Sequence, residues 1–547
     1  MDNLVFEESI TTETDQSEFT EKKWVYVNDN NAQNYSSQVV IDSTPLSNAG
    51  GYVNWSEGYI LMPLVIEATA ASGLDDADAH NMMGFKNGYW NMINSMSVEF
   101  NNQTVVQQTP FLNVFRSFKA HTSFSESDVI NHGNELGYAL DTASSWGYST
   151  ANNLSGRGVY NNEYAPPTAG SALTTNWDLG SHNEGLRKRM ENTNKLSSGK
   201  GKASVVAEAT RGLLYQSRCV SKEATKIIWE VYAKLRLKDL TDYFEKCPLL
   251  KGSTMRFLIN TNQAEVSFTP VVDGATPANS TLPVAQASVL SGNTFPLMVT
   301  SQKAPSATAS GGKVSLDTAV AVKLSVDIVK GRQSGHQTSL TSCRLYAPLY
   351  KFNPLAEQRY LSLAPTKRVE YEDVFQYQFS GVNAGDTFNF LVSNGIADIQ
   401  SVLVVPYLSA SANNGMNPFL SPYSTAGATP DPVPLQQFNI LLSGVNLFLE
   451  NEEYDFQAFS HQLASSNQLN GGLTTGLGSG LIGKFEFENL YRYYYGNASR
   501  SLPSEEGVSR SVQIVGKNAS AQQISLMVFV AFKRSMTIDI QTGSRVQ

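Results

Sequence analysis

The stretch of this sequence that comes closest to a chemical motif is GSGLIGKF, which runs from Gly478 to Phe485. Gly478, Gly483 and Lys484 have nearly the spacing of a phosphate-binding loop, in which backbone amides and a lysine hold a nucleotide. Such a loop also needs a strand before it, a hydroxyl residue after the lysine and a helix that begins there. Here Phe485 follows the lysine, the preceding segment is polar and glycine-rich, and the following FEFENLYRYYY favours a strand. We therefore expect a glycine-rich surface loop and no nucleotide site.

Histidines and carboxylates are the other side chains that could do chemistry, and neither type shows a catalytic pattern. The sequence has no HExxH motif, no histidine pair four residues apart and no GxSxG motif. We expect single histidines at the surface or in loops, with a metal site built from loops as the alternative. Adjacent acidic pairs lie beside Gly, Pro or Asn, which favours solvated loops over the separated carboxylates of a glycosidase. The histidines are His80, His121, His132, His182, His336 and His461, and the pairs are Asp75-Asp76, Glu452-Glu453 and Glu505-Glu506. No catalytic, cofactor-binding or metal-binding residue is assigned.

Two further segments have an unusual charge or aromatic content. The run LRKRMENTNKLSSGKGK could contact nucleic acid or an acidic protein surface, or serve as a nuclear-import signal, although a solvated loop is the simplest interpretation. Among the functional interpretations a protein partner is slightly favoured, because the N-terminal tail is acidic. Four tyrosines near residue 493 could stack on a sugar, but a contact between domains or subunits is the better interpretation. The charged and aromatic residues are Arg187, Lys188, Arg189, Lys195, Lys200, Lys202, Tyr491, Tyr493, Tyr494 and Tyr495.

The composition indicates a multidomain β-protein with a weakly charged surface. At 547 residues the chain exceeds what one hydrophobic core usually serves. Charged residues make up only 16%, so much of the surface is neutral and polar, and such groups cost less to desolvate than charges when a partner covers them. A net charge of −9 argues against a surface that grips nucleic acid over its whole extent. Cys219, Cys247 and Cys343 have no CxxC spacing and predict reduced, buried thiols. We expect no signal peptide and no membrane span.

Hydrophobic periodicity predicts strands almost throughout. KIIWEVYAKLRL (Lys226–Leu237) and RVEYEDVFQYQF (Arg368–Phe379) alternate apolar and polar residues, whereas three other runs are continuously apolar, as in strands covered on both faces. Helical patterns are short, and long loops rich in Gly, Ser, Asn and Pro connect the elements. The apolar runs are Tyr59–Ala68, Ser401–Leu408 and Ile524–Phe532; the expected helices open at Thr109-Pro110, follow Asp455, and cover Leu240–Lys246; the loops include 165–176, 273–279 and 411–434.

The order of these elements indicates an internal repeat. A strand containing Pro63, a strand containing Val98 and a short aromatic helix are followed, later in the chain, by a strand containing Pro406, a strand containing Val445 and another aromatic helix. Recurrence of one order and spacing predicts two copies of one β-domain. The seam is expected near 353–366, after a strand that ends at about Phe352, where the chain passes two prolines.

Four stretches of the sequence resemble the double jelly-roll major capsid proteins of the tectivirus and adenovirus-like lineage. The stretch LRLKDLTDYFEKCPLLKGSTMRFLIN (Leu235–Asn260) carries the resemblance most clearly, and it is similar above all to the capsid proteins of Polinton-like viruses and virophages. The others are KKWVYVNDNNAQNYSSQVVIDSTPLSNAGGYVNWSEGYILMPLVI, SCRLYAPLYKFNPLAEQRYLS and SGVNLFLENEEYDF. Together they span the chain from about residue 22 to its C-terminus.

This resemblance implies an all-β fold of two tandem eight-stranded jelly rolls with short helices and long loops. We expect an N-terminal jelly roll with long loop insertions over 1–352 and a C-terminal jelly roll over 353–547. It further implies a non-enzymatic major capsid protein in the virion of a DNA virus, assembled inside the host cell. Its partners would be two further copies of itself, neighbouring capsomers, penton and minor or cement proteins, with weak contact to packaged DNA. The alternative is a β-rich carbohydrate-binding or receptor-binding virion protein, or a glycoside hydrolase.

Overall fold

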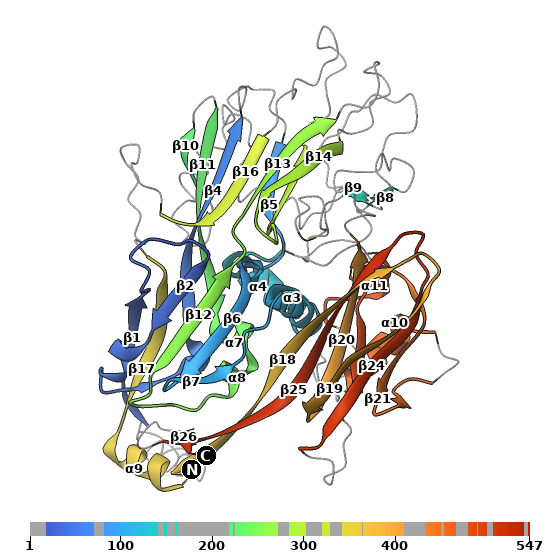
Figure 1. The fold of residues 1–547 in the computed structure, drawn as a ribbon. Coiled ribbons are helices and arrows are strands. Elements are labelled where there is room, and N and C mark those ends of the chain that lie inside the picture. Colours follow the sequence, from blue (N-terminus) through green and yellow to red (C-terminus); the bar gives the residue numbers. More distant parts are fainter. Residues whose placement is uncertain are drawn as a thin grey trace, which may run out of the picture.

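The computed structural model shows a chain built from antiparallel sheets (Figure 1). The residues that it describes are 18–70, 81–139, 147–149, 159–161, 218–222, 225–271, 284–301, 320–328, 342–363, 365–409, 419, 433–449, 453–465, 480–489, 491–499, 507–540 and 545–546. The acidic N-terminal tail before Glu18, the basic run 187–202 and the expected loops 165–176 and 273–279 lie outside them, as does most of 411–434.

The first half of the chain forms an eight-stranded sandwich. One sheet has the order β1-β17-β4-β11, and the second sheet has the order β2-β12-β6-β7. When these strands are numbered along the chain, the two orders become 1-8-3-6 and 2-7-4-5, which is the arrangement of a jelly roll. The strands are β1 (Phe19–Asn28), β2 (Gln38–Asp42), β4 (Tyr59–Ala70), β6 (Ile93–Phe100), β7 (Gln103–Val106), β11 (Lys226–Arg236), β12 (Met255–Thr261) and β17 (Arg344–Phe352).

The second half repeats this topology strand for strand. Its sheets have the orders β18-β25-β20-β23 and β19-β24-β21-β22, which again correspond to 1-8-3-6 and 2-7-4-5. The expected double jelly roll is therefore confirmed. The strands are β18 (Thr366–Val382), β19 (Thr387–Ala397), β20 (Ile399–Leu408), β21 (Leu435–Leu442), β22 (Val445–Asn446), β23 (Tyr494–Asn497), β24 (Ser509–Asn518) and β25 (Ile524–Asp539).

Additional strands enlarge mainly the first jelly roll. Figure 1 shows β10, β13, β14 and β16 at its upper end, where they extend the sheet that contains β4 and β11. They lie in the connections before β11 and between β12 and β17, so the insertions leave the eight-stranded framework intact. The additional strands are β3 (Tyr52–Val53), β5 (Asn81–Phe85), β8 (Gly147–Ser149), β9 (Val159–Asn161), β10 (Arg218–Lys222), β13 (Ala264–Val271), β14 (Val284–Ser291), β15 (Leu297–Ser301), β16 (Val320–Val326) and β26 (Arg545–Val546).

The short helices confirm three expectations and add elements that the sequence analysis missed. Helix α3 begins after Phe111, which has a left-handed backbone with a φ of 53°, and Thr109 does not cap it. Thr109 instead donates a hydrogen bond to the Val374 carbonyl at 2.5 Å. Asp455 caps α10 as expected by accepting a bond from the Ala458 amide. The helices are α2 (Thr44–Ser47), η1 (Trp55–Glu57), η2 (Tyr89–Met92), α3 (Leu112–Ser123), α4 (Glu126–Leu136), α7 (Leu237–Leu240), α8 (Asp242–Lys246), α9 (Pro354–Leu363), α10 (Phe456–Ser465) and α11 (Lys484–Asn489).

The internal repeat is confirmed for the proline strands and the helices, but one of its three pairings is wrong. Pro63 and Pro406 both lie in the third strand of a jelly roll, and α3 and α10 both follow the fifth strand. Val98, however, lies in a fourth strand and Val445 in a fifth, so the two are not equivalent. Both prolines occupy positions where one side of the strand has no ladder partner, which accommodates the missing amide.

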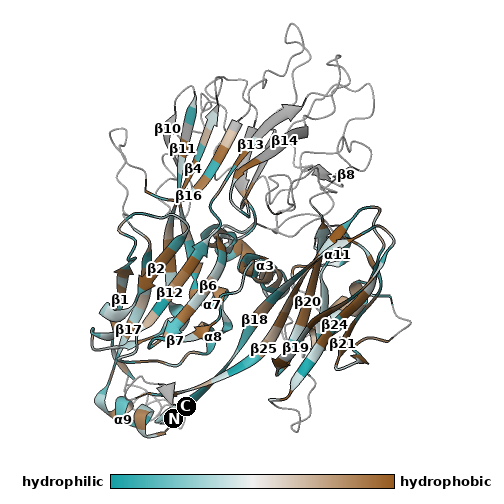
Figure 2. Ribbon diagram, in the orientation of Figure 1, coloured by the Kyte–Doolittle hydropathy of each residue, from teal (hydrophilic) through white to brown (hydrophobic). Residues whose placement is uncertain are grey.

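Each jelly roll has its own hydrophobic core, and the two cores exchange elements. Figure 2 shows apolar residues along β20 and β24 of the second jelly roll. Phe115 and Phe118 of α3 belong to this second core, although α3 comes from the first half of the chain. Conversely, Tyr371 of β18 and Met536 of β25 belong to the first core. The buried thiols of Cys247 and Cys343 are free, as expected; the side chain of Cys219 lies outside the described part of the structure.

Candidate functional site

The described part of the GSGLIGKF stretch packs against helix α3. Its described part begins at Gly480, whose φ is +68°, and the Leu481 amide donates to the His121 carbonyl at 2.7 Å. The residues after Gly483 form helix α11, so the strand expected over 485–495 is wrong there, although Tyr494 and Tyr495 do lie in β23. Lys484 lies 4.0 Å from Glu488 on the same helix. Gly478 is outside the described residues. This stretch therefore anchors the end of α3.

The histidines that the structure describes are His121, His132 and His461. His121 is fully buried on α3, where its Nδ1 lies 3.0 Å from the Tyr493 hydroxyl and its ring stacks on Tyr491 at 4.1 Å. The expected surface or loop position is thus wrong for His121 but confirmed for the exposed His132 and His461. Among the described residues, no three His, Cys, Asp or Glu side chains come close enough to hold a metal ion. His80, His182 and His336 and the acidic pairs, except Glu453, lie outside that part of the chain.

The tyrosines near residue 493 form a contact between the two halves of the chain. All four are buried; Tyr494 and Tyr495 lie in β23, and Tyr491 and Tyr493 lie just before it. The ring of Phe118 lies 5.1 Å from that of Tyr493 and 5.3 Å from that of Tyr495. A contact between domains, the favoured expectation, is therefore what the structure shows.

A polar junction joins β7 to β18 and β25. Arg534 forms an ion pair with Asp373 at 2.9 Å and donates to the Val105 carbonyl at 3.1 Å, and the Gln107 amide donates to Asp373 at 3.2 Å. The Tyr371 hydroxyl also donates to the Val105 carbonyl, at 2.6 Å. Burial raises the pKa of Asp373, against the lowering effect of Arg534. These bonds fix the two sandwiches relative to each other.

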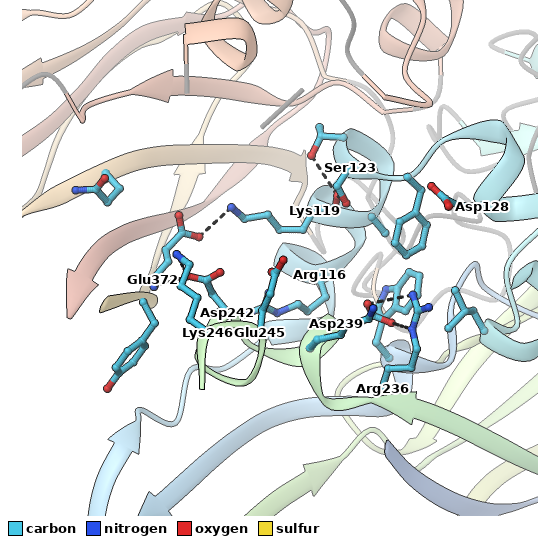
Figure 3. A pocket seen from close by; sticks show the side chains of 18 of the residues that line it. Arg116, Lys119, Ser123, Asp128, Arg236, Asp239, Asp242, Glu245, Lys246 and Glu372 are labelled. Atoms are coloured by element: carbon cyan, nitrogen blue, oxygen red, sulfur yellow. Dashed lines mark hydrogen bonds and ion pairs between the residues drawn. The ribbon is translucent and has the colours of Figure 1, made fainter. Parts of the chain in front are cut away.

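A charged cavity of about 1020 Å³ lies beside this junction (Figure 3). Helices α3, α4, α7 and α8 and strand β18 contribute its walls, so both halves of the chain are needed to form it. Most of its charges are paired across the cavity wall. The ion pairs are Lys119–Glu372 at 2.9 Å, Arg236–Asp239 at 2.5 Å, Lys246–Asp242 at 2.7 Å and Lys533–Glu370 at 2.6 Å. Sequence reasoning missed this cavity because its residues are far apart in the chain.

An outer aromatic strip, formed by Trp24, Tyr26, Tyr59 and Tyr346, crosses the solvent face of the first sheet. The rings of Tyr59 and Tyr346 stack at 5.0 Å, and Trp24 and Tyr26 flank them at 5.7 Å each. Trp24 is 46% exposed and Tyr26 is 53% exposed. Arg344 lies over the Tyr26 ring at 4.6 Å. Large aromatic rings with this much exposed area indicate a surface that a partner covers.

Comparison with known proteins identifies relatives by structure alone. No family model matches the sequence, and no curated protein does. A chain in the cryo-EM structure of the Sputnik virophage matches over 97% of this chain and 88% of its own length, with a TM-score of 0.53 and 12% identity. The mavirus major capsid protein matches over 96% of this chain and 89% of its own length, with a TM-score of 0.45 and 11% identity. The Faustovirus major capsid protein matches over 94% of this chain and 90% of its own length, with a TM-score of 0.41 and 8% identity. The chain therefore has a double jelly-roll fold, and it shares this fold with a chain of the Sputnik virophage structure.

Proposed function

We propose that this chain is a major capsid protein, a non-enzymatic subunit that trimerises into pseudo-hexagonal capsomers and builds an icosahedral shell. The observation that supports the proposal is the pair of jelly rolls with one strand order, in a chain whose whole fold is matched in the Sputnik virophage structure. Two similar modules in each chain place six similar corners around a threefold axis, which yields a nearly hexagonal block from three chains. We place the domain boundary between residues 352 and 353.

The outer aromatic strip is the surface that we propose a neighbouring subunit covers. Its rings are large and rigid, so their burial contributes contact area at a low cost in conformational entropy. An obligate interface in a capsomer should bury more than about 2,000 Å² in total. Contacts between capsomers should be weaker, so that assembly errors can dissociate and be corrected.

The location and the remaining partners follow from the same proposal. The protein would reside in the virion after assembly inside the host cell, and it would contact penton and minor or cement proteins. It would also make a weak contact with packaged DNA. No helix in the described part of the chain is long and apolar enough to span a membrane. The ion-paired acids of the charged cavity favour this structural role over glycoside hydrolysis, which requires a matched acid and base at a sugar.

Electron microscopy of the purified full-length protein tests the proposal. We expect hexagonal blocks or closed particles, and we expect Tyr26→Asp to abolish them because it places a charge in the subunit interface. Leu363→Asp is the matched control, since Leu363 is 84% exposed on α9 and lies outside the outer aromatic strip. Particles of single-chain size in the unmodified protein would contradict the capsid proposal. Intact blocks with Tyr26→Asp would contradict the placement of the interface.

A further inference from the structure

Arg116 is the unusual residue of the charged cavity. It projects from α3 between the Lys119–Glu372 and Arg236–Asp239 pairs, as Figure 3 shows. Arg116 forms no hydrogen bond and no ion pair with any residue that the structure describes, and its Nε is buried without a partner. Burial lowers the pKa of Arg116, whereas the nearby carboxylates raise it. The Arg116 side chain is half-buried as a whole, but an N–H that is buried without a bond is costly unless a ligand satisfies it.

The charges around Arg116 select the kind of anion that can bind there. Six acidic and six lysine or arginine side chains line the cavity. Four of the acids already bind another cation, among them Glu372 and Asp239, so they are not available to satisfy Arg116. A chain of phosphates would bring many negative charges against these acids, whereas a single carboxylate brings one, so the cavity is unsuited to nucleic acid. One carboxylate fits best, since its two oxygens match the planar fork of a guanidinium.

The size and the walls of the cavity indicate that this carboxylate belongs to a peptide. About 1020 Å³ is at the upper end of the volumes of small-molecule pockets. Trp90, Phe124 and Leu136 supply an apolar wall, and the Trp90 and Phe124 rings meet edge to face at 6.1 Å. We propose that the charged cavity binds a short peptide segment of a partner protein, with an Asp or Glu side chain on Arg116 and an apolar neighbour against Trp90 and Phe124. This docking site goes beyond the assembly role and does not depend on it, because one chain contains the whole cavity.

A selection from random seven-residue displayed peptides on the full-length protein tests this inference. The enriched peptides should share one Asp or Glu next to an apolar residue. In fluorescence anisotropy with a synthetic copy, Arg116→Gln should raise the Kd at least about tenfold, the size of one charge-assisted bond. Lys238→Gln is the matched control: it removes the same charge from an exposed position on the same cavity, and it should change the Kd less than about twofold.

A double-mutant cycle keeps the test decisive if Arg116→Gln perturbs folding. Changing the selected acid of the peptide to its amide should weaken binding to the unmodified protein about tenfold, but should have little further effect on Arg116→Gln. Four results would overturn the proposal: no enriched peptide, enriched peptides without an acid, an unchanged Kd with Arg116→Gln, or free N-acetylglutamate binding as tightly as the peptide. Arg116-dependent binding of an oligothymidine would instead assign the cavity to nucleic acid. The trimer is measured separately, so either proposal can fail without the other.

Discussion

Replacing Phe118 by alanine should destabilise the second jelly roll, although Phe118 precedes that domain by more than two hundred residues. Its side chain is fully buried among Tyr493, Tyr495 and Phe115. Truncating a buried phenylalanine removes its transfer free energy and leaves a cavity, at a cost of about 3–5 kcal/mol. If α3 completes the core of its neighbour, this cost must appear in β23 and not only in α3.

Hydrogen exchange measured by mass spectrometry locates the effect. Amides of β23 that exchange through opening of the second jelly roll should exchange about 10² to 10⁴ times faster in Phe118→Ala. Ile130→Ala on the neighbouring α4 is the matched control, because Ile130 is 75% exposed and should cost less than about 0.5 kcal/mol. Faster exchange confined to α3, or a loss of less than about 1 kcal/mol in the stability of the second jelly roll, would refute the idea that the halves share a core.

Three further substitutions test individual contacts. Gly480→Ala should cost about 1–3 kcal/mol in urea unfolding, because φ is +68° and the new Cβ would lie 2.5 Å from the His121 carbonyl oxygen. Arg534→Met should lower the free energy of unfolding by about 3–5 kcal/mol, because it leaves the Asp373 carboxylate buried without its cation. Adding Asp373→Asn should recover part of the lost stability. A hydrogen bond from the Tyr52 hydroxyl lowers the pKa of Glu357. The Glu357 carboxylate therefore stabilises the fold above its unfolded-state pKa, and this stabilisation is lost as the pH falls through its folded-state pKa. The difference in Tm between wild type and Glu357→Gln should therefore be larger at pH 7 than at pH 3.

Each of these expectations has a result that contradicts it. Gly444 also has a positive φ, but open space surrounds it, so Gly444→Ala should lower the free energy of unfolding less than Gly480→Ala does. Equal losses would show that the close contact of Gly480 with α3 contributes nothing. An Arg534→Met protein as stable as wild type would show that the polar junction does not hold the halves together. A Tm difference for Glu357→Gln that stays constant with pH would contradict the contact between α9 and the first jelly roll.

Local patterns predicted the strands well, because alternation reports directly on which face of a strand is buried. In β11, Trp229 and Leu235 face the core as their spacing predicts. Glu230, on the opposite face, is also buried, because the outer face of this sheet is partly covered. Alternation alone cannot predict such tertiary coverage.

The helices and the charged cavity were harder to predict, for two physical reasons. Phe485 and Phe487 have high strand propensity, yet they lie in α11, since packing against α10 outweighs a weak local preference. The helix α9 begins at the first of two prolines that suggested a plain connection. Arg116 carries no motif at all: its significance comes from the cavity around it, one wall of which is β18 in the other half of the chain. Only the folded arrangement brings these charges together.

Light scattering coupled to size-exclusion chromatography measures the central claim most directly, because it reports the mass of the assembled particle in solution. If two matched jelly rolls per chain exist to form a pseudo-hexagonal block, the purified protein has a mass near three times 59.7 kDa, or a larger multiple of that trimer. A stable species of 59.7 kDa at micromolar concentration would contradict the account.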